Sequence, residues 1–252
     1  MKEYLERIGA TDLDLRADLA TLTLLQRQHL LSVPFENLDI HWKRPIVLDP
    51  ERFYTKIVIE RRGGFCYELN GSFKVFLSSV GFDTRLVSAR VFNETTHGPE
   101  FDHAAIIVTI GDKEYLVDVG FGAFTAEPLR FVLGEKQKDD AGIFVIRKFN
   151  EEYTEVAKLE EGSHWRSEYI FRDVACKLSD FTDMCDFQQY SPESHFMKGK
   201  LCSIMTETGR KTLTEKSFII ATNGHKSETP VNSEAEFYAL LMSEFGITPT
   251  RV

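Results

Sequence analysis

The sequence predicts an α+β fold built from three segments, and two observations lead to this expectation. The chain has 252 residues, of which 42% are hydrophobic and 27% charged, an ordinary composition for a globular protein with a buried core. The spacing of apolar residues also changes twice: it is helical over 1–83, alternating over 84–175 and mixed over 176–252. Because the linkers between these segments are short, we expect lobes that share contacts rather than independent domains.

Three helices are expected in the first segment. Apolar residues recur at three- and four-residue steps between residues 15 and 29, and Pro34 ends that run. A second helix is predicted to open with Asp49 as its N-cap and Pro50 in the first helical position. A third begins at about Cys66 and ends at a glycine, the residue that suits the position after a helix C-terminus. The cysteine is thus predicted to lie where a helix begins.

Alternating apolar and polar residues predict an antiparallel sheet or barrel in the second segment. The expected strands cover residues 84–92, 104–110, 115–119, 143–149, 153–159 and 165–171. In the third segment we expect a helix capped by Ser179, strands near 201–205 and 217–222, and a final helix from Ser233 to Gly246.

The charge of the chain argues against a nucleic-acid partner. With 39 acidic and 30 basic side chains, a formal net charge of −9, it lacks the basic surface that releases counterions from a polyanion.

No apolar run approaches the ~18 residues needed to cross a bilayer, the longest being residues 104–108. The N-terminus is charged from its second residue and has no apolar signal core, so we expect a cytoplasmic protein without a membrane partner. The oligomeric state stays open.

Four cysteines raise the question of a metal site or a reactive thiol. None of Cys66, Cys176, Cys185 and Cys202 forms a Cys-x-x-Cys pair, and no cysteines and histidines cluster with zinc-ligand spacing, so no metal is expected. Cys66 differs from the others because it follows two glycines, in Arg-Arg-Gly-Gly-Phe-Cys-Tyr-Glu-Leu-Asn at residues 61–70. We interpret the other three cysteines as packing residues.

A thiol at the start of a helix can serve as a nucleophile. Only the thiolate attacks, and unpaired backbone N–H groups at a helix N-terminus lower a thiol pKa from about 8.5 toward neutrality. The same N–H groups could hold the oxyanion of a tetrahedral intermediate, and the glycines let a substrate approach. The alternative is that Cys66 is a small buried apolar residue, as most intracellular cysteines are.

A nucleophilic cysteine needs a base that a third group holds in place. His103 begins an apolar run, and Asp118 lies inside another, where a carboxylate is costly to bury unless it is paired. If residues 111–112 form a two-residue hairpin loop, Ile110 pairs with Lys113, and His103 and Asp118 fall diagonally on one sheet face. A three-residue loop would break this register. The spacing supports a Cys-His-Asp triad, against separate structural roles for each residue.

Four segments of the chain carry a familiar pattern. They are Pro-Phe-Glu-Asn-Leu at residues 34–38, Arg-Gly-Gly-Phe-Cys-Tyr-Glu-Leu-Asn at 62–70, His103, and Val-Asp-Val-Gly-Phe-Gly at 117–122. In this order and spacing they resemble the arylamine N-acetyltransferases, and the resemblance covers nearly the whole chain. It implies a helical N-terminal lobe, an antiparallel β-barrel and a C-terminal α/β lid, with the first two lobes forming a cysteine-protease-like core.

The resemblance also implies a reaction. Acetyl-CoA would acetylate Cys66, CoA would leave, and an arylamine, arylhydrazine or N-hydroxyarylamine would take the acetyl group in a ping-pong sequence. His103 would form a thiolate–imidazolium pair with the cysteine, and Asp118 would orient and stabilise the imidazolium. The particular acceptor, the preference for nitrogen or oxygen, other acyl donors and the physiological pathway stay open.

Further site residues follow from the resemblance. Phe35 and Phe124 are expected to be aromatic walls of the acceptor pocket, with ordinary core packing as the alternative for each. Glu36, Arg61 and Asn70 match supporting positions of the family. We expect a Glu36–Arg61 ion pair to brace the loop that carries the cysteine.

The glycines of the aspartate segment complete the expected site. Gly120 and Gly122 are expected to approach the CoA pyrophosphate through backbone N–H groups. Two other functions would use the same residues: a papain- or transglutaminase-like hydrolase or amide-forming enzyme, and a silent binding protein that keeps the fold. The segments at 34–38 and 117–122 disfavour the first, and the intact triad residues disfavour the second.

Overall fold

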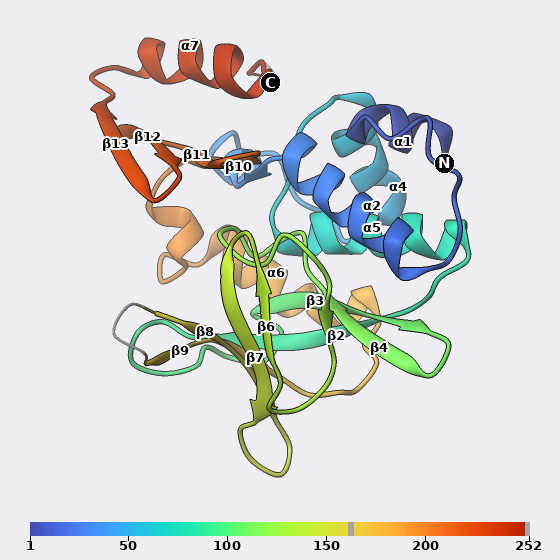
Figure 1. The fold of residues 1–252 in the computed structure, drawn as a ribbon. Coiled ribbons are helices and arrows are strands. Elements are labelled where there is room, and N and C mark those ends of the chain that lie inside the picture. The colour runs from blue at the N-terminus through green and yellow to red at the C-terminus, as the bar shows by residue number, and fades with distance from the viewer. Residues whose placement is uncertain (161–163, 250–252) are drawn as a thin grey trace.

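The computed structural model describes residues 1–160 and 164–249. It has the expected α+β architecture: N-terminal helices, a nearly closed antiparallel barrel, and a C-terminal sheet with its own helix (Figure 1). None of the helices in the described part of the chain is long and apolar enough to span a membrane.

The N-terminal helices pack around the helix that begins at Cys66. Their bounds are α1 Lys2–Ile8, α2 Leu19–Ser32, α3 Leu38–His41, α4 Pro50–Tyr54, the π-helix η1 Thr55–Ile59 and α5 Cys66–Val80. The predicted caps are confirmed: the Asp49 side chain accepts from the Glu51 N–H, and α5 ends at Gly81, whose φ of 111° is left-handed. The sequence did not reveal α1, a short helix that packs against α2.

The central sheet has eight strands in the described residues, in the order β5-β4-β3-β2-β9-β8-β7-β6. Their bounds are β2 Asp83–Val91, β3 His103–Ile110, β4 Lys113–Val117, β5 Leu129–Arg130, β6 Lys136–Asp139, β7 Gly142–Lys148, β8 Thr154–Leu159 and β9 Trp165–Phe171. The Gln137 side chain links the two edge strands by bonding both the N–H and the C=O of Arg130, at 2.7 and 2.8 Å. Helix α5 covers one face of the barrel, and a second apolar cluster fills its interior.

The hairpin between β3 and β4 sets the geometry of the site. Ile110 pairs with Lys113, and the ladder continues to Ile106 opposite Val117, so the two-residue loop is confirmed. The side chains of His103 and Asp118 consequently lie on one face at the end of this hairpin.

The C-terminal part combines a small sheet with helices, and an N-terminal strand joins it. The elements are β1 Phe35–Glu36, the 3₁₀ helices η2 Leu178–Phe181 and η3 His195–Lys198, α6 Thr182–Tyr190, β10 Leu201–Thr206, β11 Gly209–Thr214, β12 Ser217–Thr222, β13 His225–Pro230 and α7 Glu234–Phe245. Strand β1 pairs with β10, so the sheet binds the helical lobe directly.

One predicted cap in this part is wrong and another is confirmed. Ser179 is not an N-cap, because a 3₁₀ turn begins one residue earlier and Asp180 accepts from the Lys177 N–H at 2.8 Å. Ser233 does cap α7: its side chain accepts from the Glu236 N–H.

Candidate active site

Cys66 occupies the first position of α5 and is almost fully buried, with 4% of its surface exposed. The Glu68 carboxylate accepts from the Phe65 N–H at 3.1 Å and so fixes the start of the helix. The two preceding glycines are required sterically. A Cβ on Gly63 would lie 1.9 Å from the carbonyl oxygen of Pro34, so a larger residue would displace the loop.

His103 and Asp118 form a buried hydrogen-bonded pair. The distance from His103 Nε2 to Asp118 Oδ2 is 2.7 Å, and both residues are at most 2% exposed. The other carboxylate oxygen accepts from Asn70 Nδ2 at 2.8 Å and from the Gly120 N–H at 2.9 Å. The Tyr169 hydroxyl donates to Oδ2 at 3.3 Å. Hydrogen bonds therefore satisfy both oxygens of this buried carboxylate.

The cysteine and this pair meet through backbone contacts. The Cys66 thiol is hydrogen-bonded to the backbone of Ala104, the residue after the histidine. A Cβ on Gly120 would lie 2.8 Å from Cys66 Cα, so only glycine allows the aspartate loop to approach the helix this closely. Asn70, which lies on α5, joins this helix to the histidine strand and to the aspartate loop. Its amide donates to the Ala104 carbonyl and accepts from the Val119 N–H.

The pKa of Cys66 differs from the sequence expectation. Burial raises the thiol pKa well above its ordinary value, and the hydrogen bond with Ala104 opposes this only in part. The helix N-terminus does not outweigh burial, because the thiolate is removed from water. A thiolate here needs a positive partner next to it.

The predicted Glu36–Arg61 ion pair is wrong by one residue. Glu36 Oε1 lies 2.7 Å from Arg62 Nη2, and Asp39 Oδ1 lies 2.5 Å from Arg62 Nη1. Arg61 has a left-handed φ of 54° and an exposed side chain, so the neighbouring arginine enters the core instead. Arg62 also stacks over the Trp42 ring at 4.6 Å.

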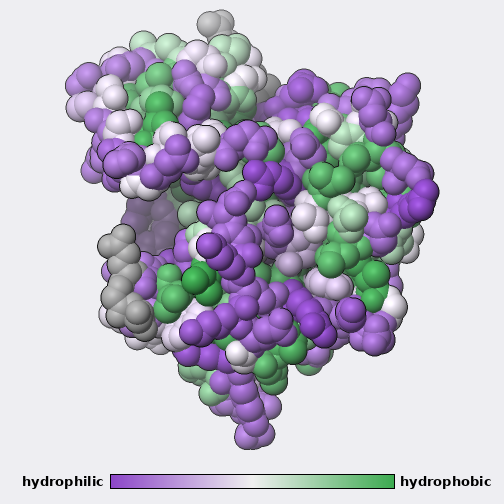
Figure 2. Space-filling view, in the orientation of Figure 1, coloured by the Kyte–Doolittle hydropathy of each residue, from purple (hydrophilic) through white to green (hydrophobic). Residues whose placement is uncertain are grey.

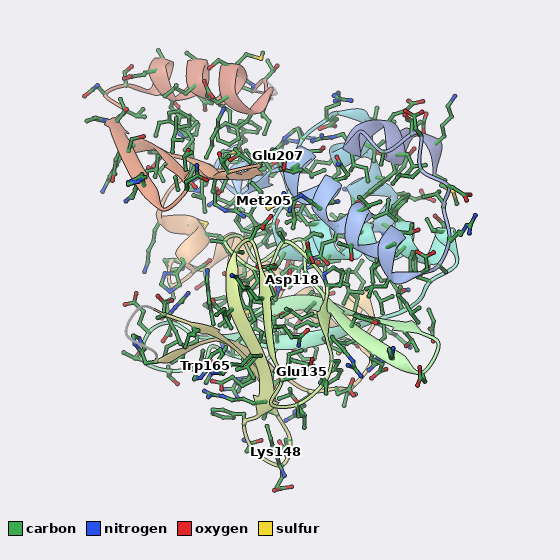
Figure 3. All side chains as sticks on the ribbon, in the orientation of Figure 1. Asp118, Glu135, Lys148, Trp165, Met205 and Glu207 are labelled. Carbon is green, nitrogen blue, oxygen red and sulfur yellow. The ribbon has the colours of Figure 1, made fainter. Side chains whose placement is uncertain are left out.

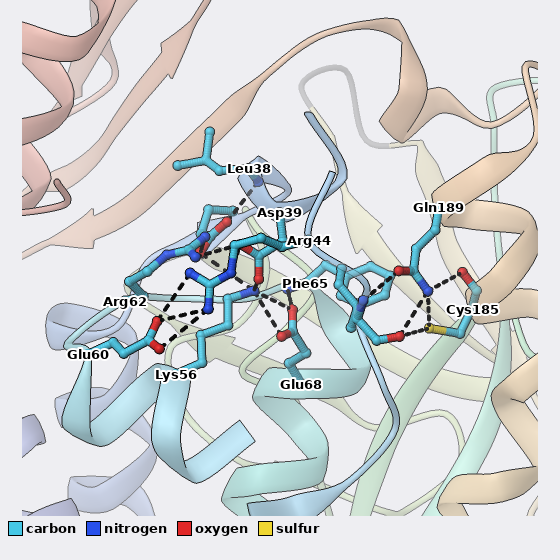
Figure 4. Close-up of polar contacts among 12 residues, drawn as sticks. Leu38, Asp39, Arg44, Lys56, Glu60, Arg62, Phe65, Glu68, Cys185 and Gln189 are labelled. Atoms are coloured by element: carbon cyan, nitrogen blue, oxygen red, sulfur yellow. Dashed lines mark hydrogen bonds and ion pairs between the residues drawn. The ribbon is translucent and has the colours of Figure 1, made fainter. Parts of the chain in front are cut away.

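The buried ion pairs extend to the first turn of α5 (Figure 4). Lys56 Nζ lies 2.9 Å from Asp39 and 2.8 Å from Glu68. Burial opposes the charge on Lys56, but the surrounding carboxylates outweigh it and raise the pKa of this ammonium. Burial raises the pKa of Glu68 to about 6 despite the nearby ammonium. The network fixes the loop before the cysteine to the helix after it.

A cleft of about 720 Å³ lies between the barrel and the C-terminal sheet. The surface is hollowed between these parts in Figure 2, and Figure 3 places Met205 and Glu207 on the segment that borders it. Phe124, predicted as an acceptor wall, lines this cleft. Phe35 lines a smaller adjoining cavity together with Gly122, and Met205 borders both.

The two glycines expected near CoA differ in their backbone contacts. The Gly120 N–H already donates to Asp118, so it is occupied within the protein. The Gly122 carbonyl accepts from Arg210 Nη2 at 2.5 Å, and a Cβ at this residue would meet no atom within 4 Å. Gly122 therefore borders open space.

Three residues at the site were not found from the sequence. Tyr169 lies in a strand like any alternating aromatic residue, and Phe121 packs edge-on against the His103 ring with centroids 5.3 Å apart. Arg210 carries no local motif. Among the described residues no group of three or more histidine, cysteine, aspartate or glutamate side chains is arranged to hold a metal ion.

Comparison with known proteins places this geometry in one family. The N-acetyltransferase family model matches residues 18–251. A pineal gland isozyme of arylamine N-acetyltransferase from Gallus gallus is 32% identical over 275 residues, covering 100% of this chain and 95% of that protein.

Solved structures agree over the whole fold. An arylamine N-acetyltransferase from Bacillus cereus, described as having a Cys-His-Glu catalytic triad, superposes with a TM-score of 0.91 at 30% identity, covering 98% of both chains. The Mycobacterium marinum enzyme in complex with CoA gives 0.89 at 27% identity, covering 97% of this chain and 92% of that one. The chain therefore belongs to the arylamine N-acetyltransferase family.

Proposed function

We propose that this protein transfers an acetyl group from acetyl-CoA to the nitrogen of an aromatic amine or hydrazine, or to the oxygen of an N-hydroxyarylamine, through an acetylated Cys66. The observation that carries the proposal is the buried His103–Asp118 pair beside a cysteine at the start of a helix. The family names and the CoA complex of the Mycobacterium marinum relative support the two substrates.

In the first half-reaction, His103 removes the thiol proton. Its Nε2 is bonded to Asp118, which leaves Nδ1 as the nitrogen that accepts the proton. The Cys66 sulfur attacks the carbonyl carbon of acetyl-CoA, and the carbon–sulfur bond to CoA then breaks. The imidazolium returns its proton to the departing CoA sulfur.

The raised thiol pKa is compatible with this step. Burial disfavours an isolated thiolate at Cys66, but a thiolate formed together with an imidazolium is a neutral pair. Asp118 stabilises the imidazolium, and the Ala104 N–H stabilises the sulfur anion. We therefore expect the proton to pass from Cys66 to His103 when the substrate binds and excludes water from the site.

In the second half-reaction, the acceptor nitrogen attacks the thioester carbonyl. His103 takes a proton from the attacking amine, the carbon–sulfur bond to Cys66 breaks, and the proton returns to the sulfur. Phe124, which lines the large cleft, and Phe35, which borders a small cavity of about 10 Å³ next to it, are the proposed aromatic walls for an acceptor ring bound in the large cleft. Gly122 is proposed to contact CoA, and Gly120 to let the aspartate loop approach the cysteine.

The test is the mass of the protein after each half-reaction. Acetyl-CoA should add one acetyl group to the Cys66 peptide, and aniline should then remove it and yield acetanilide. The Cys66→Ala variant should stay unlabelled, whereas Cys176→Ala, which changes a more exposed thiol, should label like the parent. A thioester that decays to acetate at the same rate with and without amine would support a hydrolase instead. No label on folded protein would contradict the proposal.

A further inference from the structure

Glu68 lies two residues after Cys66, and its carboxylate turns back to the loop that precedes the cysteine. Its Oε2 accepts a hydrogen bond from the Phe65 N–H at 3.1 Å. A Cβ on Gly64 would lie 2.8 Å from the same oxygen, so the carboxylate also packs closely against the glycine of the loop. One side chain therefore holds the two residues that come directly before Cys66.

Lys56 is the counterion of this carboxylate. Its Nζ lies 2.8 Å from Glu68 Oε1 and 3.0 Å from Oε2, and both side chains are almost fully buried (Figure 4). The buried part of the network has three carboxylates, those of Glu36, Asp39 and Glu68, and two cations, Lys56 and Arg62. One negative charge is thus in excess among these five buried groups.

A cavity of about 220 Å³ connects this carboxylate with the surface. Its lining includes the buried Glu68 and Lys56 as well as the exposed Arg52 and Glu60, so protons from solvent reach the carboxylate without unfolding of the chain. Besides the buried ion-paired groups, the charged or titratable side chains that face Glu68 are Arg44, Arg52 and Glu60 at the cavity and Cys185 on α6.

The charge on Glu68 lowers the stability of the fold. Burial raises the pKa of this carboxyl from 4.5 to about 6, and Lys56 opposes the shift only in part. Because the folded chain binds the proton more tightly than the unfolded chain, the stabilising contribution is complete below pH 4.5 and is lost as the pH rises through about 6. A glutamine at the third helical position would accept the same N–H without this cost. Capping alone therefore does not account for a carboxylate here.

We propose, on the basis of the function proposed above, that Glu68 is a positioning residue and a pH switch: its anion, tied to Lys56 and to the Phe65 N–H, holds Cys66 in place for His103, and its protonated form does not. In weak acid a proton from solvent neutralises the carboxylate, and Lys56 keeps only Asp39 and Glu36 as counterions, at 2.9 and 3.7 Å. The Phe65 N–H then loses a charge-assisted acceptor, whose hydrogen bond is roughly twice as strong as a neutral one. Attack by Cys66 should slow as a result.

The effect passes through the position of the thiol rather than through the electric field on it. The charges that act most strongly on the Cys66 pKa are those of Asp102 and Asp118, whereas Lys56 neutralises Glu68 at 2.8 Å. Replacing Glu68 by glutamine should therefore change where the thiol lies more than how readily it ionises.

The experiment compares the parent protein with Glu68→Gln, which keeps the cap and imitates the protonated acid. The variant leaves two buried cations against two carboxylates and should therefore fold. Acetylation of Cys66 by acetyl-CoA and its alkylation by iodoacetamide are each followed by peptide mass between pH 5 and pH 8. The parent should react about tenfold faster than the variant at pH 8 and less than about twofold faster at pH 5. The midpoint of this change should lie near pH 6.

The matched control is Glu236→Gln on α7. Glu236 is likewise the third residue of its helix, and its carboxylate accepts from the Asn232 N–H at 2.8 Å. It has no ammonium partner among the described residues and lies far from α5 in the sequence. This variant should react like the parent at every pH.

The fluorescence of Trp42 gives a second measurement that needs no reaction at the cysteine. Its ring stacks on the Arg62 guanidinium at 4.6 Å, and Trp165→Phe leaves it as the only tryptophan of the chain. In this background the emission should change with a midpoint near pH 6, and adding Glu68→Gln should abolish the change.

Three results would overturn the inference. A rate ratio between parent and Glu68→Gln that stays constant from pH 5 to pH 8 would make Glu68 a structural cap only. Equal rates at pH 8 would show that its charge does not position the thiol, and a fluorescence change that persists in Glu68→Gln would belong to another group. Failure of the proposed function is distinct, because Cys66 of the parent would then be alkylated with the expected pH dependence but would take no acetyl group.

Discussion

The carboxylate of Asp118 is buried and fully hydrogen-bonded, and it supports the His103 ring. It is 1% exposed, and the Asn70 amide, the Gly120 N–H, the Tyr169 hydroxyl and the His103 ring all bond it. These donors satisfy both oxygens and hold the carboxylate in one orientation. A fixed anion next to one ring nitrogen determines which nitrogen of the histidine carries the proton and stabilises the imidazolium.

Asp118→Asn should therefore reduce kcat/KM by roughly 10²- to 10⁴-fold while the protein stays folded. The amide keeps the size of the side chain but loses the charge that supports a protonated His103. The matched control is Asp112→Asn, which makes the same change at the exposed tip of the same hairpin and should keep full activity. Rapid-quench mass measurement of the rate at which Cys66 is acetylated reports the first half-reaction directly. A rate within threefold of the parent would show that this carboxylate is dispensable.

The predictability of the site depended on regular backbone. His103 and Asp118 could be placed together because alternation and a two-residue loop fix the register of a hairpin. The ion pair expected of Arg61 is made by Arg62 instead, because the direction of a side chain on an irregular loop depends on φ, which the sequence does not give. Arg210 meets Gly122 across 88 residues, a contact that only tertiary packing creates.

At the scale of elements, the loop before α5 is held by charge. Arg62→Gln should lower the free energy of unfolding by about 3 kcal/mol or more, because it leaves Glu36 and Asp39 buried without their guanidinium. Denaturant titration monitored by fluorescence measures the change. Arg61→Gln is the control: an exposed neighbour with the same substitution should change stability by less than about 0.5 kcal/mol. Equal effects would refute the assignment of the pair to Arg62.

Acid should weaken the packing of α1 on α2 through one histidine. His29 is fully buried, its Nδ1 lies 2.8 Å from the Tyr4 hydroxyl, and burial lowers its pKa from 6.5 to about 3. His29 binds a proton near pH 6.5 in the unfolded chain but not in the folded chain. Buried neutral His29 therefore makes its full contribution to the free energy of unfolding above pH 6.5. This contribution decreases as pH falls toward 3, by about 1.4 kcal/mol per unit.

The His29→Gln variant tests this dependence. Between pH 7 and 5 the parent should lose about 2 kcal/mol more of its unfolding free energy than the variant does, because the variant lacks this proton. Urea titrations at both pH values give the comparison, and all other titrating groups are shared. Parallel losses in the two proteins would mean that His29 does not couple folding to pH.

Elements with local signals were predicted and the others were missed. Helices with a capping residue, such as those opened by Asp49 and Ser233, were found from the sequence because the cap is a local interaction. Strand β13 was missed because it is exposed throughout and shows no apolar alternation. The π-helix after α4 was also missed, since its extra residue per turn depends on packing rather than composition.

At the scale of the molecule, one side chain joins all three parts. Arg27 on α2 donates to Asp140, in the turn between β6 and β7, at 2.9 Å and to Glu207, in the turn between β10 and β11, at 3.0 Å. All three residues line the large cleft. Half-exposed ion pairs add little to the free energy of unfolding. We therefore expect them mainly to keep the two turns that border the cleft well ordered.

Arg27→Gln should therefore loosen the cleft without unfolding the protein. We expect a loss of less than about 1 kcal/mol in unfolding free energy, because both carboxylates regain water when the ion pairs are lost. Hydrogen exchange in peptides covering residues 139–142 and 206–209 should accelerate, because each turn loses its tie to α2. The control Arg16→Gln breaks a surface pair with Asp14 within one loop and should leave both peptides unchanged. Unchanged hydrogen exchange in Arg27→Gln would contradict this prediction. It would mean that the neighbouring strands alone order the two turns and that the Arg27 ion pairs do not stabilise the contact of the three parts at the cleft.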